Sequence, residues 1–396
     1  MKNISYFLFF IFFVSCTSEI ENNSSVEGAV SLEEGFTPHP ELKRMPHPNA
    51  KAKELKIIAD NTSLPKNLQL LYSFLNDDIH DINLRELELH VSSQHSFHAA
   101  SIDEHILVIL DQRRNRLIQF NLNEDTFKDL APEGRGPGDL LFTKEMQVFD
   151  NKIYIAMQGY RISIFNCETG ACEYESTIQT DFNNYSLSPT EDYVTVLGIP
   201  PFGRDQDQDP ENYDLPLIYL LKKENNQLER SFSRIYQHKA PIVREQMNSG
   251  GTVRTFPKFE TSVVMNNIFP YIYLYNNQGE LTEKFKIPGF KVGYYDYNER
   301  ELRGRFRHND NTTISNTTKI GEEWVLLQFR NREGMEYKDR EGLEGNQWYT
   351  YYAFNVKNHE LHTLGEDFNE RSIYTTEYGL LINEAGSSLY WLSLKN

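Results

Sequence analysis

The chain has 396 residues, of which 39% are hydrophobic and 24% charged, and its 40 Lys and Arg against 57 Asp and Glu give a formal net charge of −17. This polarity excludes a protein with many membrane spans, and the acidic balance argues against non-specific nucleic-acid binding, which needs a basic surface. The length suits one large domain or two ordinary ones. With only 3 cysteines, the fold must be stabilised by a packed core rather than by a disulfide framework.

The first sixteen residues predict export and lipid attachment. Lys2 places a positive charge before an apolar run at 6–14, which is too short to span a hydrocarbon core that needs about 20 residues. Residues 1–15 are therefore interpreted as a signal peptide. The motif Phe13-Val14-Ser15-Cys16 resembles a bacterial lipobox, which implies cleavage before Cys16 and a lipid on its thiol. An ordinary secretory signal with an incidental cysteine is the alternative.

Residues 16–52 are expected to form a lipidated tether and linker. Segment 17–25 is polar and mildly acidic, and it resembles the short acidic export signal of surface lipoproteins in Bacteroidota-type bacteria. Prolines within 38–48 disfavour long helices or strands, so residues 26–48 are expected to be a linker or a strap along the domain. We expect an outer-membrane lipoprotein that is held at the membrane by its lipid alone and faces either the cell surface or the periplasm.

Residues 53–396 predict one all-β domain, because short runs rich in Val, Ile, Tyr and Phe alternate with Gly, Asn and Asp turns. Pairs of such runs recur in about six units over roughly 300 residues. A regular β repeat of this kind predicts a six-bladed β-propeller of four-stranded antiparallel blades. The repeated strand pairs are 106–110 with 117–122, 153–157 with 162–166, 193–197 with 217–221, 262–265 with 271–275, 324–329 with 348–354, and 379–382 with 389–394.

Two segments that precede the first strand pair are predicted to form a closing strand and a helix. The last unit has no obvious outer strand after Leu394, so residues 84–91 are predicted to supply one and to close the ring. Residues 64–75 have helical periodicity, and Pro65 suits a first helical turn. This helix is predicted to cap or strap the β domain through one apolar face, which carries Leu68, Leu71, Phe74 and Leu75.

Three motifs carry a resemblance to known propellers. Residues 111–120 (DQRRNRLIQF) are similar to the NHL-type propeller repeat, and 161–165 (RISIF) repeats its second half. The turn 133–139 (EGRGPGD) resembles the Gly-Pro-Gly-acidic turn of six-bladed β-propeller lipoproteins of Bacteroidota. The resemblance covers about residues 85 to 396 and implies the propeller fold. It implies no catalytic residues, because that family is mostly uncharacterised.

Cys167 and Cys172 are predicted to form a disulfide. They bracket a four-residue loop between two predicted strands, and facing positions across a hairpin bring two sulfurs within reach. An exported protein also meets an oxidising compartment. Two reduced thiols are the alternative, and the lack of nearby His ligands argues against zinc.

Several polar motifs are interpreted as structural, so we predict no metal and no cofactor. The glycines of 133–139 are assigned to an inter-blade turn, because Pro137 removes a donor that a phosphate loop would need. Residues 205–211 (DQDQDPE) alternate acidic side chains as calcium loops do, but Pro210 stands where glycine is expected, which favours an exposed acidic loop. His95 and His98 would point to opposite faces of a strand and are assigned to the core or rim.

The most suggestive feature of the sequence is a local reversal of charge. Basic residues outnumber acidic ones in the stretches 230–259 and 300–307. In so acidic a protein, a local cluster of basic residues can attract an anionic ligand. The alternative is that these residues are ordinary solvated charges on loops. The candidate ligand-binding residues are Arg244, Arg254, Lys258, Arg303, Arg305 and Arg307.

The sequence as a whole favours binding over catalysis. We expect a monomeric binding or interaction scaffold at the cell envelope, with an envelope glycan or a protein as partner and without nucleic acid. The alternative is a propeller-fold hydrolase or lyase that acts on polysaccharide through acid and base groups facing the channel. A purely structural lipoprotein is a third possibility.

Overall fold

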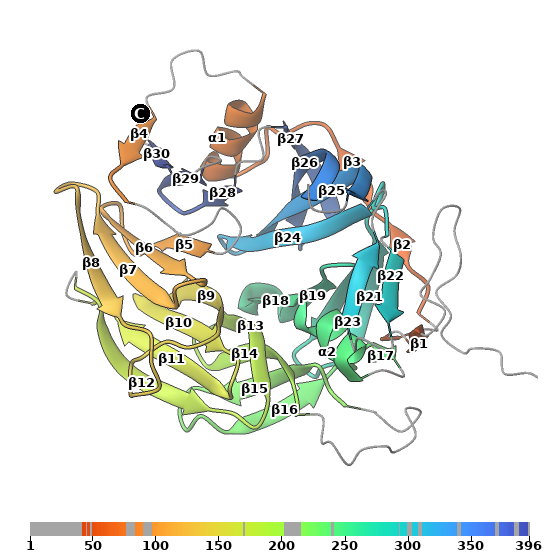
Figure 1. Cartoon of the computed structure of the whole chain (residues 1–396), viewed down its shortest axis with the longest axis horizontal. Helices are drawn as coiled ribbons and strands as arrows, with labels where there is room; N and C mark the ends of the chain where they lie inside the picture. Colours follow the sequence, from red (N-terminus) through yellow and green to blue (C-terminus); the bar gives the residue numbers. More distant parts are fainter. Residues whose placement is uncertain are drawn as a thin grey trace, which may run out of the picture.

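Six antiparallel sheets surround a central axis in the computed structural model (Figure 1). The structure describes residues 42–44, 46–47, 50–76, 84–89, 97–168, 171–201, 215–238, 241–292, 294–298, 303–307, 311–338, 342–368, 372–383 and 388–394. Each sheet contains four strands in meander order, and two of the sheets gain a fifth strand at the outer edge. The predicted all-β, six-bladed propeller is thereby confirmed.

Each blade begins with its innermost strand. Blade I consists of β5 (Phe97–Ser101), β6 (Ile106–Asp111), β7 (Arg116–Asn121) and β8 (Thr126–Ala131), blade II of β9 (Thr143–Phe149), β10 (Lys152–Met157), β11 (Arg161–Asn166) and β12 (Glu173–Gln179), and blade III of β13 (Asn183–Pro189), β14 (Tyr193–Ile199), β15 (Ile218–Lys222) and β16 (Leu228–Phe232). The predicted strand pairs of these blades correspond to their second and third strands.

The remaining three blades repeat this pattern. Blade IV consists of β18 (Gly251–Phe256), β19 (Thr261–Asn266), β20 (Tyr271–Asn276) and β21 (Leu281–Lys286), blade V of β24 (Asn311–Ile320), β25 (Trp324–Lys338), β26 (Gly342–Asn355) and β27 (Glu360–Asp367), and blade VI of β28 (Ser372–Thr375), β29 (Gly379–Asn383), β30 (Leu389–Ser393) and β4 (Arg85–Leu87). Here too, the predicted pairs match the second and third strands.

The hydrophobic core lies between neighbouring blades. The second strand of a blade is covered on both faces, so β6 reads as a nearly continuous apolar run (ILVILD) and is buried throughout. The outer strand β8 (TFKDLA) covers the edge of the same sheet and is exposed over most of its length. This difference in burial explains why the second and third strands have the clearest signals in the sequence.

The closing strand of the ring comes from the N-terminal side of the domain, as predicted. β4 pairs antiparallel with β30, and Leu87 lies opposite Leu389. Leu87 is buried in a cluster that includes Trp391 and Tyr374. The last blade is therefore completed by a strand far from it in sequence, which ties the two ends of the domain together.

β2 (Lys53–Glu54) and β3 (Lys56–Ile58) lie at the outer edges of blades IV and V, and the helix α1 (Lys66–Leu75) packs beside blades V and VI (Figure 1). β2 adds in parallel to β21, and β3 adds in parallel to β27. The helix α1 follows, with Pro65 as its N-cap and with Leu68, Leu71 and Phe74 buried. It contacts β27, β28 and β29, so the predicted helix does strap the β domain.

Further short elements lie at the ends of blades III and IV. They are β1 (Leu42–Arg44), which pairs with β17 (Gln237–His238), the helix α2 (Pro241–Ser249), the 3-10 helix η2 (Pro257–Phe259), and the hairpin of β22 (Tyr294–Asn298) with β23 (Arg303–Arg307). Part of the segment expected to be a linker thus pairs with the domain at β1.

The glycine-rich turn joins blade I to blade II, as predicted. It lies between β8 and β9, where the Asp139 carboxylate accepts a hydrogen bond of 2.7 Å from the backbone N–H of Gly136. Gly138 has a φ of +82°, a conformation that favours glycine, and its Cα faces the ring of Tyr174.

Candidate ligand site in the central channel

The central channel is lined by the first strands of the blades, and its side chains are mostly polar. β13 has the sequence NNYSLSP and β24 has NTTISNTTKI. Ser186, Ser188 and Thr317 are nonetheless buried. Polar side chains buried at this position need hydrogen-bond partners, and the inner strands supply them to one another.

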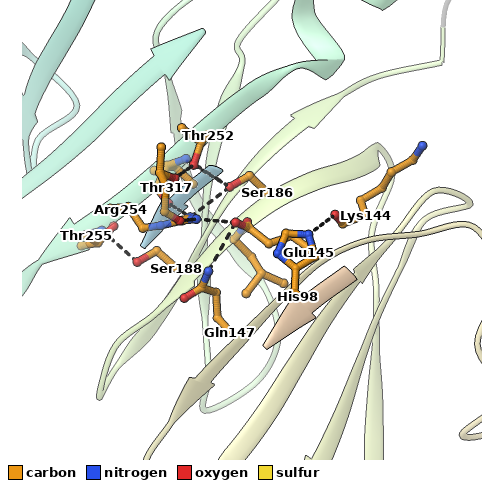
Figure 2. A network of polar contacts seen from close by, with 12 residues as sticks. His98, Lys144, Glu145, Gln147, Ser186, Ser188, Thr252, Arg254, Thr255 and Thr317 are labelled. Atoms are coloured by element: carbon orange, nitrogen blue, oxygen red, sulfur yellow. Dashed lines mark hydrogen bonds and ion pairs between the residues drawn. The ribbon is translucent and has the colours of Figure 1, made fainter. Parts of the chain in front are cut away.

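An ion pair between Arg254 and Glu145 occupies the middle of the channel (Figure 2). Arg254 comes from β18 and is 1% exposed, and Glu145 comes from β9 and is 5% exposed. Leaving either charge buried without its partner would cost several kcal/mol, whereas the pair is neutral as a unit. The two residues therefore stabilise each other inside the ring.

Hydrogen bonds extend this ion pair to further inner strands. The Arg254 guanidinium donates to the carbonyl of Thr317 on β24 at 2.6 Å and to the hydroxyl of Ser186 on β13 at 3.3 Å. The Glu145 carboxylate accepts from the backbone N–H of Leu187 at 2.8 Å. Four inner strands are thus joined at one point. Arg254 Nε is buried and has no hydrogen-bond partner among the described residues.

A polar hollow of about 230 Å³ opens on the side of this ion pair that faces α2, and we name it the α2-side hollow. The strands β5, β9, β13, β18 and β24 contribute to its wall, together with the end of α2. Its lining side chains are predominantly hydroxyls and amides, and they include Gln112, Ser186, Ser249, Thr252, Asn267, Ser315 and Asn316.

Lys144 is the cation of the α2-side hollow. Its Nζ lies 5.7 Å from the centre of the Tyr185 ring, and Tyr185 donates a hydrogen bond of 3.1 Å to Glu245 on α2. Burial lowers the pKa of Lys144, and the nearby Glu245 partly offsets this effect. Among the described side chains, no carboxylate lies within ion-pair distance of the Lys144 amine. Lys144 can therefore donate hydrogen bonds to a ligand.

Tyr185 is a hydrogen-bond donor rather than a base in this arrangement. Burial is the main cause that raises the pKa of its phenol, and the Glu245 carboxylate raises it further. The phenol consequently keeps its proton at neutral pH and holds the Glu245 carboxylate through its hydrogen bond.

His98 on β5 lines the same hollow and is neutral at pH 7. Burial lowers its pKa, and this effect exceeds the opposing effect of Glu145. Its Nε2 donates to the carbonyl of Lys144 at 3.1 Å, and Gln112 donates to the same oxygen. With the proton on Nε2, the neutral ring carries its lone pair on Nδ1.

The predicted basic residues are distributed over different parts of blade IV and its connections. Arg254 is in the channel centre and is paired with Glu145. Arg244 lies on α2, which contacts the strand β23 that carries Arg303, Arg305 and Arg307, and the structure describes only the backbone of these four residues.

Lys258 lies apart from that group. It belongs to η2, at the opposite end of β18 from α2, and six residues of strand separate the two ends by roughly 20 Å. Its amine is within 3.1 Å of Glu323 and 3.4 Å of Glu322. The structure thus does not bring Lys258 together with α2 and β23.

The remaining motifs from the sequence are placed as follows. A disulfide joins Cys167 and Cys172 at the ends of β11 and β12, and both residues are buried. In the part of the chain that the structure covers, no group of three or more His, Cys, Asp or Glu is arranged to hold a metal. Cys16, His95 and segment 205–211 lie outside the described residues.

Sequence reasoning missed Lys144 and Tyr185. Both follow short polar or turn-like segments, and nothing in the spacing marks them as neighbours. Their convergence requires the register of β9 against β13, two inner strands from different blades.

Comparisons with known proteins locate the fold and no more. No family model matches the sequence, and no curated protein matches it. A solved structure of a member of the DUF4221 family from Bacteroides vulgatus is 10% identical with a TM-score of 0.50, and the match covers 79% of this chain and 98% of that one. Likeness at this identity shows the propeller fold alone.

Two further solved structures are similar to this chain with lower TM-scores. A protein from Bacteroides fragilis described as exported is 10% identical with a TM-score of 0.46, over 86% of this chain and 99% of that one. The WD40 propeller domain of Doa1 is 9% identical with a TM-score of 0.42, over 78% of this chain and 96% of that one.

No helix in the described ranges is long and apolar enough to cross a bilayer.

Proposed function

We propose that this protein is a lipid-anchored, exported β-propeller that binds the end of an envelope glycan in the α2-side hollow. The observation that carries the proposal is the hollow itself, which combines many hydroxyl and amide groups with Lys144, whose amine has no carboxylate within ion-pair distance among the described side chains. The protein acts as a monomeric binding scaffold at the outer membrane, where the lipid on Cys16 attaches it.

The chemistry of the wall supports a polyhydroxylated ligand. Side-chain hydroxyls and amides both donate and accept hydrogen bonds, as the hydroxyl groups of a sugar do. Aromatic rings of Phe97, Tyr185 and Tyr374 also contribute to the lining and provide apolar surface for the C–H face of a sugar ring. The volume is below the roughly 300–1,000 Å³ of drug-sized sites, so only the end of a glycan enters.

Two exposed aromatic residues extend the site beyond the hollow. Phe142 is 59% exposed and immediately precedes β9, and Tyr160 is 36% exposed in the adjacent turn. Both have positive φ values, +53° and +68°, which are uncommon for bulky residues and persist where the surrounding structure enforces them. They stand at the same end of β9 and β13 as Lys144 and Tyr185, where further sugar units can stack on them.

Binding of glycans by the intact mature protein tests this proposal. We expect a defined subset of envelope glycans to be retained on an array, and Lys144→Met to weaken binding about tenfold or more, because it removes a charged hydrogen-bond donor. Lys152→Met is the matched control, since Lys152 pairs with Glu175 on the surface of blade II. Equal binding by all three proteins would contradict a site at Lys144, and retention of only a protein partner would favour the interaction scaffold.

A second candidate function is a hydrolase or lyase that acts on polysaccharide, and His98 is the observation that favours it. A neutral histidine with a free lone pair in a polar hollow can act as a general base. This candidate predicts new reducing or unsaturated ends when the protein is incubated with a bound polysaccharide, and loss of that activity in His98→Asn. Binding without any product would leave the scaffold function alone.

A further inference from the structure

A second hollow of about 210 Å³ lies at the opposite side of the channel, and we name it the α1-side hollow. Along β9, Glu145 lines the α2-side hollow, whereas Gln147, two residues further on, lines the α1-side hollow. Along β24, residues 314–317 line the α2-side hollow and residues 316–320 line the α1-side hollow, so the order along the strand is the same as in β9. The Arg254–Glu145 network (Figure 2) lies between the two hollows, so each is approached from its own face of the ring.

Lys319 lines the α1-side hollow, and its amine has few hydrogen-bond partners among the described residues. Lys319 Nζ donates to the carbonyl of Thr255 at 2.9 Å and lies 5.1 Å from the centre of the Phe256 ring. An ammonium group has three donors, and this is the one hydrogen bond that it makes among the described residues. Burial lowers the pKa of Lys319 to about 8, because the charged form is poorly solvated.

The charged groups around Lys319 do not supply a partner. Glu322 acts on it from a distance, but its carboxylate lies 3.4 Å from the amine of Lys258. Arg254 repels the Lys319 charge from the channel centre. Glu377 and His98 line the same hollow, and within the described residues neither forms an ion pair with Lys319.

A second side chain of the hollow also lacks a partner. Thr375 comes from β28 in blade VI, is 2% exposed and lines the α1-side hollow. Its hydroxyl has no hydrogen-bond partner among the described residues. A buried hydroxyl without a partner costs free energy, and a ligand that accepts its hydrogen bond recovers that cost.

We propose that the α1-side hollow is a separate binding site for a small oxyanion, a carboxylate or a phosphate, which accepts hydrogen bonds from the amine of Lys319 and the hydroxyl of Thr375. An oxyanion supplies the negative charge and the acceptor atoms that these two groups lack. The linings of the two hollows share His98, Asn316, Thr317 and Tyr374, but each hollow has its own lysine, so binding at Lys319 can be measured separately from binding at Lys144.

Acylation of lysines on the intact mature protein, mapped by peptide mass spectrometry across a pH series, tests the proposal. The probes are inorganic phosphate and glucuronate, each compared with sodium chloride at equal ionic strength. We expect each effective anion to shift the half-labelling pH of Lys319 upward, because an anion favours the charged amine. A shift of one pKa unit slows labelling about tenfold at pH values below the pKa.

Controls within the same protein separate this site from the glycan site. Lys152 on the surface and Lys144 in the other hollow are expected to keep their labelling pH when phosphate is added. Thr375→Val, which keeps the shape and removes the hydroxyl, is expected to reduce the protection of Lys319 by either anion several-fold. Protection by phosphate but not glucuronate, or the reverse, identifies which oxyanion fits.

Two results would overturn the proposal. One is labelling of Lys319 that is unchanged by both anions up to tens of millimolar. The other is protection that is equal in wild type and Thr375→Val, because the anion would then lie outside the hollow. Neither result bears on glycan binding at Lys144.

Discussion

At the scale of single residues, the channel interior is governed by how its charges are paired. Arg254 has both a carboxylate partner and backbone acceptors, so it is a structural group. Lys144 and Lys319 have no carboxylate within ion-pair distance among the described side chains, and burial lowers the pKa of both. The same residue class thus has a structural role in the middle of the channel and a binding role at each end.

Replacing Arg254 tests the structural role. Arg254→Met leaves Glu145 charged and buried, which is expected to reduce the free energy of unfolding by about 3–5 kcal/mol in denaturant titrations. Glu145→Gln combined with Arg254→Met removes both charges and is expected to recover part of that loss. Arg116→Met, at an exposed pair with Asp129, is the control and costs about 0–1 kcal/mol. A loss at Arg254 as small as the control's would show that the pair does not hold the inner strands.

Replacing Lys319 gives a pH-dependent effect whose sign follows from its lowered pKa. Between pH 8 and 10.5 the unfolded chain holds this proton and the native protein releases it, so the wild type gains stability with rising pH. Below pH 8 the native protein must keep a buried charge. We therefore expect Lys319→Met to be most favourable relative to wild type below pH 8, and this advantage to shrink toward pH 10.5. The measurement is the free energy of unfolding of both proteins across this pH range. A difference between Lys319→Met and wild type that does not vary with pH would contradict a lowered pKa at Lys319.

At the scale of elements, the strands that pack between blades were predictable and the strands that line the channel were not. The second and third strands of each blade agree with the predicted strand pairs because they are apolar, as in β10 and β11. The inner strands β13 and β24 are rich in Ser, Thr and Asn, because their side chains meet each other around a polar channel. They lack the alternation of a half-buried strand, and the candidate site, which they carry, was missed with them.

The helix and the closing strand illustrate how far local patterns reach. Helix α1 spans Lys66–Leu75 where 64–75 was expected, and the closing strand is Arg85–Leu87 where 84–91 was expected. Both have clear local signals, an apolar helical face and an alternating strand. The addition of β2 and β3 to blades IV and V has no comparable signal, because these strands are short and mostly exposed.

Ring closure depends on Leu87. Leu87→Ala removes a side chain that is buried in the core cluster between blades VI and I, and is expected to cost about 2–5 kcal/mol of unfolding free energy. Leu228→Ala, on the outer strand β16 where Leu228 is 52% exposed, is the control and is expected to cost under about 0.5 kcal/mol. Equal effects in thermal or denaturant unfolding would mean that β4 does not contribute to the stability of blade VI.

The Cys167–Cys172 disulfide is expected to make a modest contribution. It closes a loop with a sequence separation of only 5 residues, so its removal in Cys167→Ala/Cys172→Ala is expected to cost about 2 kcal/mol. The double variant should also become insensitive to reductant in unfolding experiments, unlike the wild type. If reductant leaves the wild-type unfolding midpoint unchanged under denaturing conditions, the disulfide makes no measurable contribution.

At the scale of the whole molecule, the net charge of −17 conceals where a ligand binds. The basic stretches that stand out in the sequence are divided between the channel centre, the region of α2 and β23, and the opposite end of β18. The two lysines that line the hollows come instead from β9 and β24, where nothing in the local composition marks them. The closed ring creates both sites, because it brings side chains from several blades to each end of one channel.

The glycan that the protein retains most strongly, crystallised with the intact mature protein, provides the most direct test of the central claim. We predict density for a terminal sugar in the α2-side hollow, within hydrogen-bond distance of Lys144 and in contact with Tyr185. A sugar bound only on the outer strands of the blades, or an α2-side hollow that holds water alone at saturating glycan, would contradict the claim that this end of the channel is the binding site.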